Sequence, residues 1–136
     1  MLSIFPVKYI RMQFEVKPYD IDAAGHVNNI VYIRWIEDLR TRFSEANFNL
    51  PKVIHDGLYL AVVATSINYK CQVKLFDELT GSLEFVSFNH GIITFKIVIS
   101  SGKGICAVAE QKCAFINLAD NKMEKDLVSY GCSNIS

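Results

Sequence analysis

Hydrophobic and polar residues alternate between residues 9 and 16, which is the period of a β-strand with one buried face. From residue 30 the apolar side chains instead recur at three- and four-residue steps, the spacing of one helix face: Ile30, Ile33, Ile36, Leu39 and Phe43. Asn28 or Asn29 can cap this helix, and the proline at position 51 limits its end to the segment between Asn47 and Pro51. The pattern therefore predicts an opening strand followed by one long amphipathic helix.

Beyond Gly57 the sequence predicts four further strands, over residues 58–69, 79–88, 93–99 and 105–118. A short helical turn around residues 53–55 can precede them. The segments 89–91 and 101–104 have hairpin length, so we expect an antiparallel meander and an α+β fold that forms a single domain over residues 1–136. Because one helix covers only one face of a five-stranded sheet, apolar residues left on strand edges predict an oligomer.

Composition agrees with a folded domain, since 51% of the 136 residues are hydrophobic and 21% are charged. Lys and Arg number 14, as do Asp and Glu, so the formal charge is zero and nucleic acid is not expected as a partner. The longest apolar stretches, residues 58–64 and 105–109, are too short for a membrane span. The N-terminus lacks the features of a signal peptide, so we expect a cytoplasmic protein.

The cysteines and histidines do not predict a metal site. Cys71, Cys106, Cys113 and Cys132 form no CxxC pair, and the three histidines are scattered along the chain. We therefore expect buried thiols, with Cys132 the most exposed, and neither a metal nor a cofactor.

Residues 19–37 read YDIDAAGHVNNIVYIRWIE. This segment resembles the hot-dog-fold thioesterases of the 4-hydroxybenzoyl-CoA thioesterase-like, acyl-CoA thioesterase family. Residues 57–79 are similar to the family's second block. The resemblance implies a five-stranded antiparallel sheet wrapped around one long central helix, and subunits that join their sheets edge to edge with active sites at the interface. It also implies a homodimer or a homotetramer.

By this resemblance, Asp22 matches the carboxylate that attacks the thioester or activates water, and the backbone N–H of Asn29 matches the oxyanion donor. The chemistry is consistent, because a helix N-terminus offers N–H donors and a positive dipole end to a carbonyl oxygen that gains negative charge. The alternative for Asp22 is a turn or helix-capping residue.

His26 corresponds to the histidine of a GHVNN motif that is similar to one in plant acyl-carrier-protein thioesterases, where this histidine is catalytic. It can orient water or polarise the carbonyl, or its polar atoms can instead be satisfied by loop backbone. Two positions depart from the plant enzymes, which have asparagine where this chain has Ala24 and glutamate where it has Gln72. Gln72 can hold a water molecule but cannot act as a base.

The residues expected to contact the substrate are Gly25, Asn28, Tyr32, Trp35 and Gln72. For Tyr32 and Trp35 the alternative is the hydrophobic core, and for Asn28 it is a helix cap. Glu37 is expected to be structural and to pair with Arg40 or a neighbouring subunit.

The sequence therefore predicts an acyl-CoA thioesterase that hydrolyses a fatty or aromatic acyl thioester to free acid and thiol. An acyl-carrier-protein thioesterase and a non-catalytic acyl-thioester-binding protein of the same fold are the alternatives.

Overall fold

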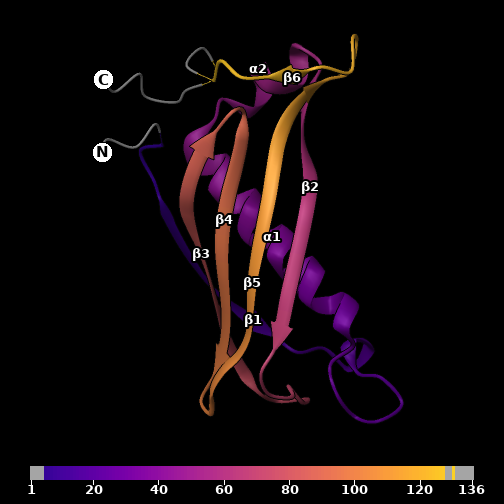
Figure 1. Cartoon of the computed structure of the whole chain (residues 1–136). Coiled ribbons are helices and arrows are strands. Elements are labelled where there is room, and N and C mark those ends of the chain that lie inside the picture. The colour runs from indigo at the N-terminus through magenta and orange to yellow at the C-terminus, as the bar shows by residue number, and fades with distance from the viewer. Residues whose placement is uncertain (1–4, 128–129, 131–136) are drawn as a thin grey trace.

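The computed structural model describes residues 5–127 and Tyr130, and Figure 1 shows one antiparallel sheet that curves around a long helix. The elements in chain order are β1 (Tyr9–Glu15), the 3-10 helix η1 (Pro18–Asp20), α1 (Asn29–Asn47), α2 (Leu50–His55), β2 (Leu58–Tyr69), β3 (Glu78–Asn89), β4 (Ile92–Ser101), β5 (Gly104–Asn117) and β6 (Met123–Glu124).

The five predicted strands and the long helix are confirmed, and the strand ends differ from the expected ones by one or two residues. The sequence did not predict η1 or the two-residue strand β6. Helix α2 is longer than the expected turn because Asn49 caps it, accepting a hydrogen bond from the backbone N–H of Lys52 at 3.3 Å.

The strand order β1-β3-β4-β5-β2 corrects one expectation. Strands β3, β4 and β5 form the predicted meander, and His90 and Gly91 have the positive φ angles, 52° and 81°, of a tight hairpin turn. Strand β2, however, pairs with β5 instead of β3, so β1 and β2 form the two edges of the main sheet. Alternation specifies which side chains share a face but not which strand is the neighbour.

The buried face of α1 is also shifted from the expected one. Asn28 caps the helix, and its side chain accepts a hydrogen bond from the backbone N–H of Ile30 at 3.1 Å. Ile30 and Ile33 are 71% and 41% exposed, whereas Tyr32 and Trp35 are buried. Figure 1 shows α1 crossing the sheet obliquely, with its N-terminal end reaching past β2. The sheet therefore does not cover the outer side of the first helical turns.

A cluster of phenylalanine rings fills the space between the C-terminal half of α1 and the sheet. Phe43 is fully buried and meets Phe5 and Phe95 edge to face, with ring centroids 5.2 and 4.8 Å apart. Such contacts contribute beyond the apolar area they bury. They hold α1 in one position against the sheet.

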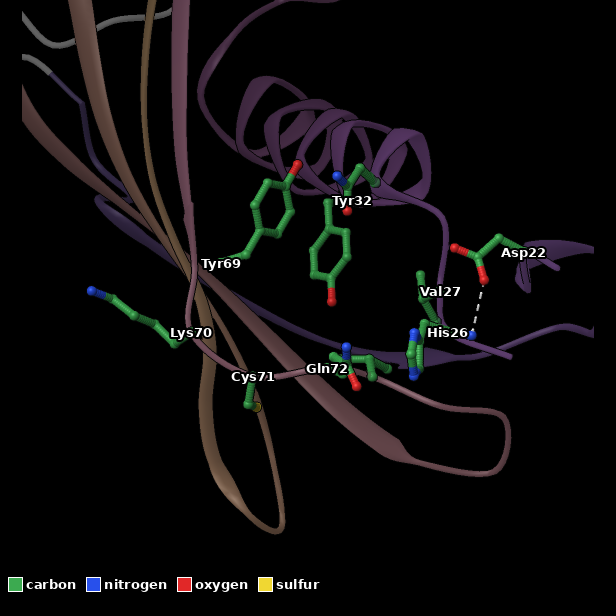
Figure 2. Close-up of a pocket in the computed structure, with 10 residues that line it drawn as sticks. Asp22, His26, Val27, Tyr32, Tyr69, Lys70, Cys71 and Gln72 are labelled. Carbon is green, nitrogen blue, oxygen red and sulfur yellow. Dashed lines mark hydrogen bonds between the residues drawn. The ribbon is translucent and has the colours of Figure 1, made fainter. Parts of the chain in front are cut away.

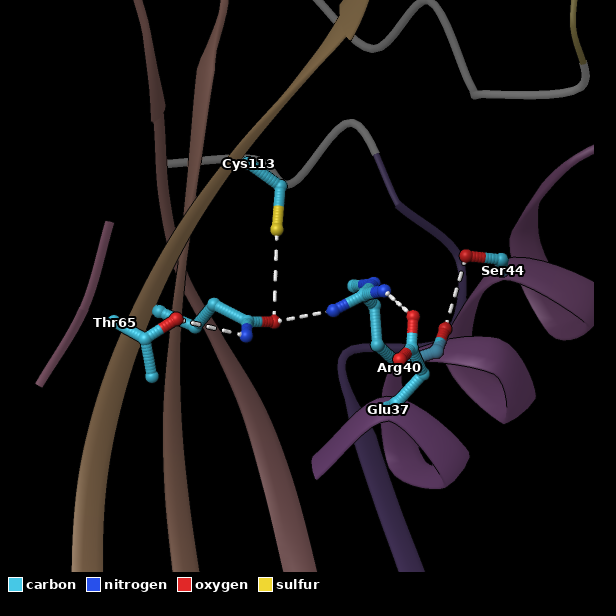
Figure 3. A network of polar contacts seen from close by, with 6 residues as sticks. Glu37, Arg40, Ser44, Thr65 and Cys113 are labelled. Carbon is cyan, nitrogen blue, oxygen red and sulfur yellow. Dashed lines mark hydrogen bonds and ion pairs between the residues drawn. The ribbon is translucent and has the colours of Figure 1, made fainter. Parts of the chain in front are cut away.

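A buried polar network also joins α1 to the sheet (Figure 3). Arg40 donates hydrogen bonds to the side-chain oxygen of Gln111 at 2.8 Å and to the carboxylate of Glu37. Gln111 in turn donates to Thr65 on β2 at 3.1 Å. The expected pairing of Glu37 with Arg40 is therefore confirmed.

Strand β2 leaves large apolar side chains exposed along its length. Val62, Val63 and Tyr69 are 46%, 56% and 45% exposed, and the outer edge of β2 has no partner strand within the described residues. No helix in this described part of the chain is long and apolar enough to cross a membrane.

Candidate active site

The loop between η1 and α1 fixes the carboxylate of Asp22. Oδ1 of Asp22 accepts hydrogen bonds from the backbone N–H groups of Ala24 at 2.9 Å and His26 at 3.1 Å. The backbone of Asp22 closes the same turn, because its N–H donates to the carbonyl of His26 at 2.8 Å and its carbonyl accepts from Gly25 at 3.0 Å. Gly25 has a φ of +82°, a backbone conformation that glycine adopts without strain.

The two carboxylate oxygens of Asp22 differ in their surroundings. Oδ1 serves the turn, whereas Oδ2 has no hydrogen-bond partner within the residues that the structure describes. The side chain is also exposed. One oxygen therefore holds the carboxylate in place while the other remains open to water or substrate.

The N-terminus of α1 lies beside this loop and provides a backbone donor. Asn28 uses its side-chain and backbone oxygens to satisfy the N–H groups of Ile30 and Val31, at 3.1 and 2.9 Å. The N–H of Asn29, the first helical residue, has no partner in residues 5–127 or Tyr130. It is a free donor at the positive end of the helix dipole.

A pocket of about 250 Å³ opens between this helix end and the segment that follows β2 (Figure 2). Its walls join two segments distant in sequence, and the N–H of Val27 donates to the carbonyl of Val73 at 2.8 Å. The lining residues are Asp22, His26, Val27, Asn29, Tyr32, Tyr69, Lys70, Cys71, Gln72 and Val73.

Five of the eight residues predicted for the site therefore lie together in this pocket: Asp22, His26, Asn29, Tyr32 and Gln72. Gly25 shapes the Asp22 turn and Asn28 caps α1, and neither lines the pocket. Trp35 is buried in the core, where it packs against Phe14 and Tyr32 with centroid distances of 5.5 and 5.3 Å.

The other lining residues were not among the eight predicted for the site: Val27, Tyr69, Lys70, Cys71 and Val73. Tyr69 packs edge to face on Tyr32, with ring centroids 5.1 Å apart, so the two tyrosines form one aromatic side of the pocket. The only available sequence signal was the similarity of residues 57–79 to the family's second block.

Two side chains in the pocket resist ionisation. Burial raises the pKa of the Tyr32 phenol to about 12, so it stays a hydrogen-bond donor near neutral pH. A hydrogen bond to Cys106, with sulfur atoms 2.9 Å apart, and partial burial raise the pKa of the Cys71 thiol. Because the thiolate is the reactive form, Cys71 is a poor nucleophile here.

The sequence analysis predicted that the cysteines are buried thiols. Cys106 and Cys113 are free and buried, as expected, whereas Cys71 is only partly buried. Cys132 lies outside the described residues. In the same described residues, no three His, Cys, Asp or Glu side chains gather in a way that could hold a metal ion.

The family model described as the thioesterase-like superfamily matches residues 16–127. The chain belongs to this superfamily. The match spans the Asp22 loop, helix α1 and all strands of the sheet except β1. The predicted family and the predicted activity class, thioester hydrolysis, are therefore confirmed.

Individual members of the superfamily are similar over nearly the whole chain. The long-chain acyl-CoA thioesterase FadM of Escherichia coli (strain K12) is 27% identical over 124 residues, which cover 90% of this chain and 92% of that protein. The crystal structure of the probable thioesterase YbaW from Escherichia coli superposes with a TM-score of 0.76 at 26% identity, covering 84% of this chain and 87% of that one.

A hypothetical protein from Staphylococcus aureus, solved in complex with CoA, has a TM-score of 0.82 at 15% identity and covers 96% of this chain and 90% of that one. Because its identity is low, this second structure supports the fold alone. Together with the single sheet around α1, these likenesses confirm the predicted α+β hot-dog fold.

Proposed function

We propose that this thioesterase hydrolyses acyl-CoA, with a fatty or aromatic acyl group, to a free acid and CoA. The proposal rests on the pocket in which an open oxygen of Asp22 and the free N–H of Asn29 come together. Hydrolysis of a thioester requires two groups at the carbonyl: a carboxylate that acts as nucleophile or base, and a donor that binds the carbonyl oxygen.

In the proposed reaction, the thioester oxygen accepts a hydrogen bond from the N–H of Asn29 while negative charge builds on it. Asp22 either takes a proton from the water that attacks the carbonyl carbon, or attacks this carbon itself and forms an anhydride that water then hydrolyses. In both cases the carbon–sulfur bond breaks and CoA leaves with the electron pair on sulfur. The proton lost by water ends on the thiol or in solvent.

His26 is proposed to orient the water or to polarise the carbonyl. Its backbone N–H and carbonyl serve the Asp22 turn, but its imidazole has no hydrogen-bond partner within the described residues, which argues against a ring satisfied by loop backbone. His26→Ala keeps both backbone contacts. We therefore expect kcat to fall about a hundredfold with little change in KM or in melting temperature. A variant with normal kcat would remove His26 from the reaction.

Gln72 and Tyr32 are proposed to contact the substrate or the attacking water. Both line the pocket, and each offers a neutral donor: the Gln72 amide and the Tyr32 hydroxyl. Neither is proposed as a base. Gly25 and Asn28 are proposed to act indirectly, Gly25 by shaping the Asp22 loop and Asn28 by capping α1. Trp35 is proposed to support the aromatic wall by packing against Tyr32.

The choice of CoA as the carrier is supported by one relative. FadM, which is 27% identical, is a long-chain acyl-CoA thioesterase. An acyl-carrier-protein thioesterase is the alternative. A panel of acyl-CoAs from short to long chains, with benzoyl-CoA and an acylated carrier protein, separates them by release of free thiol. Thiol release from the acylated carrier protein but from no acyl-CoA would contradict the choice of CoA.

We also propose that two copies of the chain pair through β2, as a homodimer or within a homotetramer. The support is the edge of β2, which has no partner strand among the described residues and exposes Val62, Val63 and Tyr69. Ile30 and Ile33 are exposed on the nearby end of α1. A monomer would leave these apolar side chains in water. The pocket ends at the same edge, because Tyr69 belongs both to it and to β2.

Sedimentation tests the assembly with a matched pair of variants. Val63 on β2 and Val86 on β3 are 56% and 54% exposed, so they differ in place but hardly in exposure. We expect Val63→Lys to shift the protein toward the 15.4 kDa monomer and Val86→Lys to leave pairing intact. A wild-type monomer at micromolar concentration, or equal behaviour of both variants, would contradict pairing through β2.

A further inference from the structure

Asp20 is a carboxylate enclosed by protein immediately before the candidate active-site loop. Its exposed fraction is 1%, and both of its oxygens are satisfied. Oδ1 accepts a hydrogen bond from the guanidinium of Arg34 at 2.7 Å, and Oδ2 accepts from the backbone N–H of Lys17 at 2.9 Å. Its backbone N–H donates to the carbonyl of Lys17 at 2.9 Å. No polar group of Asp20 is therefore left to contact a substrate.

These contacts tie together three points of the chain that surround Asp22. Lys17 precedes η1 as its N-cap, and Arg34 lies in the second turn of α1. The third point is Asn28, the helix cap, whose backbone N–H donates to the carbonyl of Asp20 at 2.9 Å. Asp22 is two residues from this junction, and Asn29 follows the cap directly.

This ion pair is poor evidence for stability, because removing the Asp20 carboxylate from water costs about as much as its attraction to the half-exposed Arg34 guanidinium returns. A role in positioning the loop relative to the helix accounts for the pair better. The loop carries the carboxylate and the helix carries the N–H donor, so their relative position depends on contacts that join loop to helix. Asp20 provides two of these contacts, the ion pair with Arg34 and the backbone bond from Asn28.

We propose that Asp20 and Arg34 are a positioning pair for thioester hydrolysis, which holds the Asp22 carboxylate and the Asn29 N–H at a fixed separation. The inference rests on the proposed function of Asp22. Neither Asp20 nor Arg34 contacts the reacting atoms. Their effect is expected on kcat, because displacement of a reacting group by about 1 Å can cost about a hundredfold in rate.

The main test is Asp20→Asn, which keeps the shape of the side chain and an oxygen for Lys17 but removes the charge opposite Arg34. With the best acyl-CoA, well below the melting temperature, we expect kcat to fall between about tenfold and a hundredfold and KM to change less than about threefold. Glu45→Gln, which neutralises an exposed carboxylate on α1, is the charge control and should behave as wild type.

Arg34 gives a second route that does not disturb the buried carboxylate itself. Its side chain is 51% exposed, so Arg34→Lys should fold and keep a positive charge near Asp20. We expect Arg34→Lys to retain more of kcat than Arg34→Met, since lysine lacks the planar fork but keeps the charge. Arg42→Met, at an exposed position of the same helix, is the control for loss of an arginine.

A positioning role also predicts that the pair acts only through Asp22. Adding Asp20→Asn to Asp22→Asn should lower the residual rate by less than about twofold. If Asp20→Asn damaged the fold in general, it would lower the rate of the Asp22→Asn variant by the same factor as it lowers the wild-type rate. Folded Asp20 and Arg34 variants with the kcat of their controls, or equal losses in both backgrounds, would overturn the inference. Full activity of Asp22→Asn alone would instead overturn the proposed function, and the positioning role with it.

Discussion

Replacing Gly81 with alanine tests how closely the sheet packs against the helix. Gly81 lies on the inward face of β3, opposite Met12 of β1 and Ile99 of β4. A Cβ atom at this position would lie 2.5 Å from Cε2 of Phe14 and 3.1 Å from the terminal methyl groups of both Ile99 and Leu39. The first distance is far inside van der Waals contact, so something must move.

The expected cost follows from two opposing effects. Overpacking of a core costs about 1 to 3 kcal/mol. Alanine offsets about 0.4 to 1 kcal/mol of this, because it restricts the unfolded chain more than glycine does. The φ angle of Gly81 does not require glycine, so steric overlap alone decides the result. We expect a net destabilisation of about 1 to 2 kcal/mol, which for a domain of this size lowers the melting temperature by about 3 to 8 °C.

Urea unfolding measures this change, at one protein concentration because subunit pairing adds to apparent stability. Gly102→Ala is the matched control, since a Cβ there meets no atom within 4 Å. It should stay within about 0.5 kcal/mol of wild type. If Gly81→Ala proved as stable as Gly102→Ala, the ring of Phe14 would have room to move and the close packing inferred here would be wrong.

Two further predictions concern buried polar groups. Because the pKa of Tyr32 is raised to about 12 in the folded state, the unfolded chain loses this proton first, and stability falls as pH rises from about 10 to 12 with no effect below. The free energy of unfolding should fall less steeply over that range in Tyr32→Phe, and equal slopes would contradict the raised pKa. Gln111→Leu should cost about 2 to 3 kcal/mol, since it removes a partner of the buried Arg40 guanidinium. Arg40→Met combined with Gln111→Leu should recover most of this loss in urea unfolding, and additive losses would argue against the network.

Much of the fold could be predicted because burial imposes simple periods on the sequence. Alternation located the strands, and the two hairpins followed from short turn segments such as 89–91. The phase of the helix was less predictable. Ile30 and Ile33 are more hydrophobic than Tyr32 and Trp35, yet the latter are buried because α1 extends past the sheet edge. Hydrophobicity alone does not reveal where a helix extends beyond the sheet that covers it.

The candidate site was predictable on one side only. The Asp22 loop and the start of α1 are contiguous in sequence, so their residues could be named together. The opposite wall, from Tyr69 to Val73, reaches the pocket because β2 pairs with β5 at the sheet edge and Val73 binds Val27. That pairing is a long-range contact with no local pattern. The role of Asp20 was hidden for the same reason, since its partner Arg34 is visible only in the folded chain.

The central claim is that Asp22 carries out thioester hydrolysis, and steady-state kinetics of Asp22→Asn test it most directly. The substrate is the best acyl-CoA from the panel, thiol release is the readout, and Asp38→Asn is the control with one exposed carboxylate removed from α1. Asn keeps an oxygen for the N–H groups of Ala24 and His26, so the turn and the melting temperature should be preserved. We predict that kcat falls more than about a hundredfold in Asp22→Asn and stays at the wild-type value in Asp38→Asn. A folded Asp22→Asn whose kcat lies within about tenfold of wild type, a barrier change of about 1.4 kcal/mol, would contradict the account.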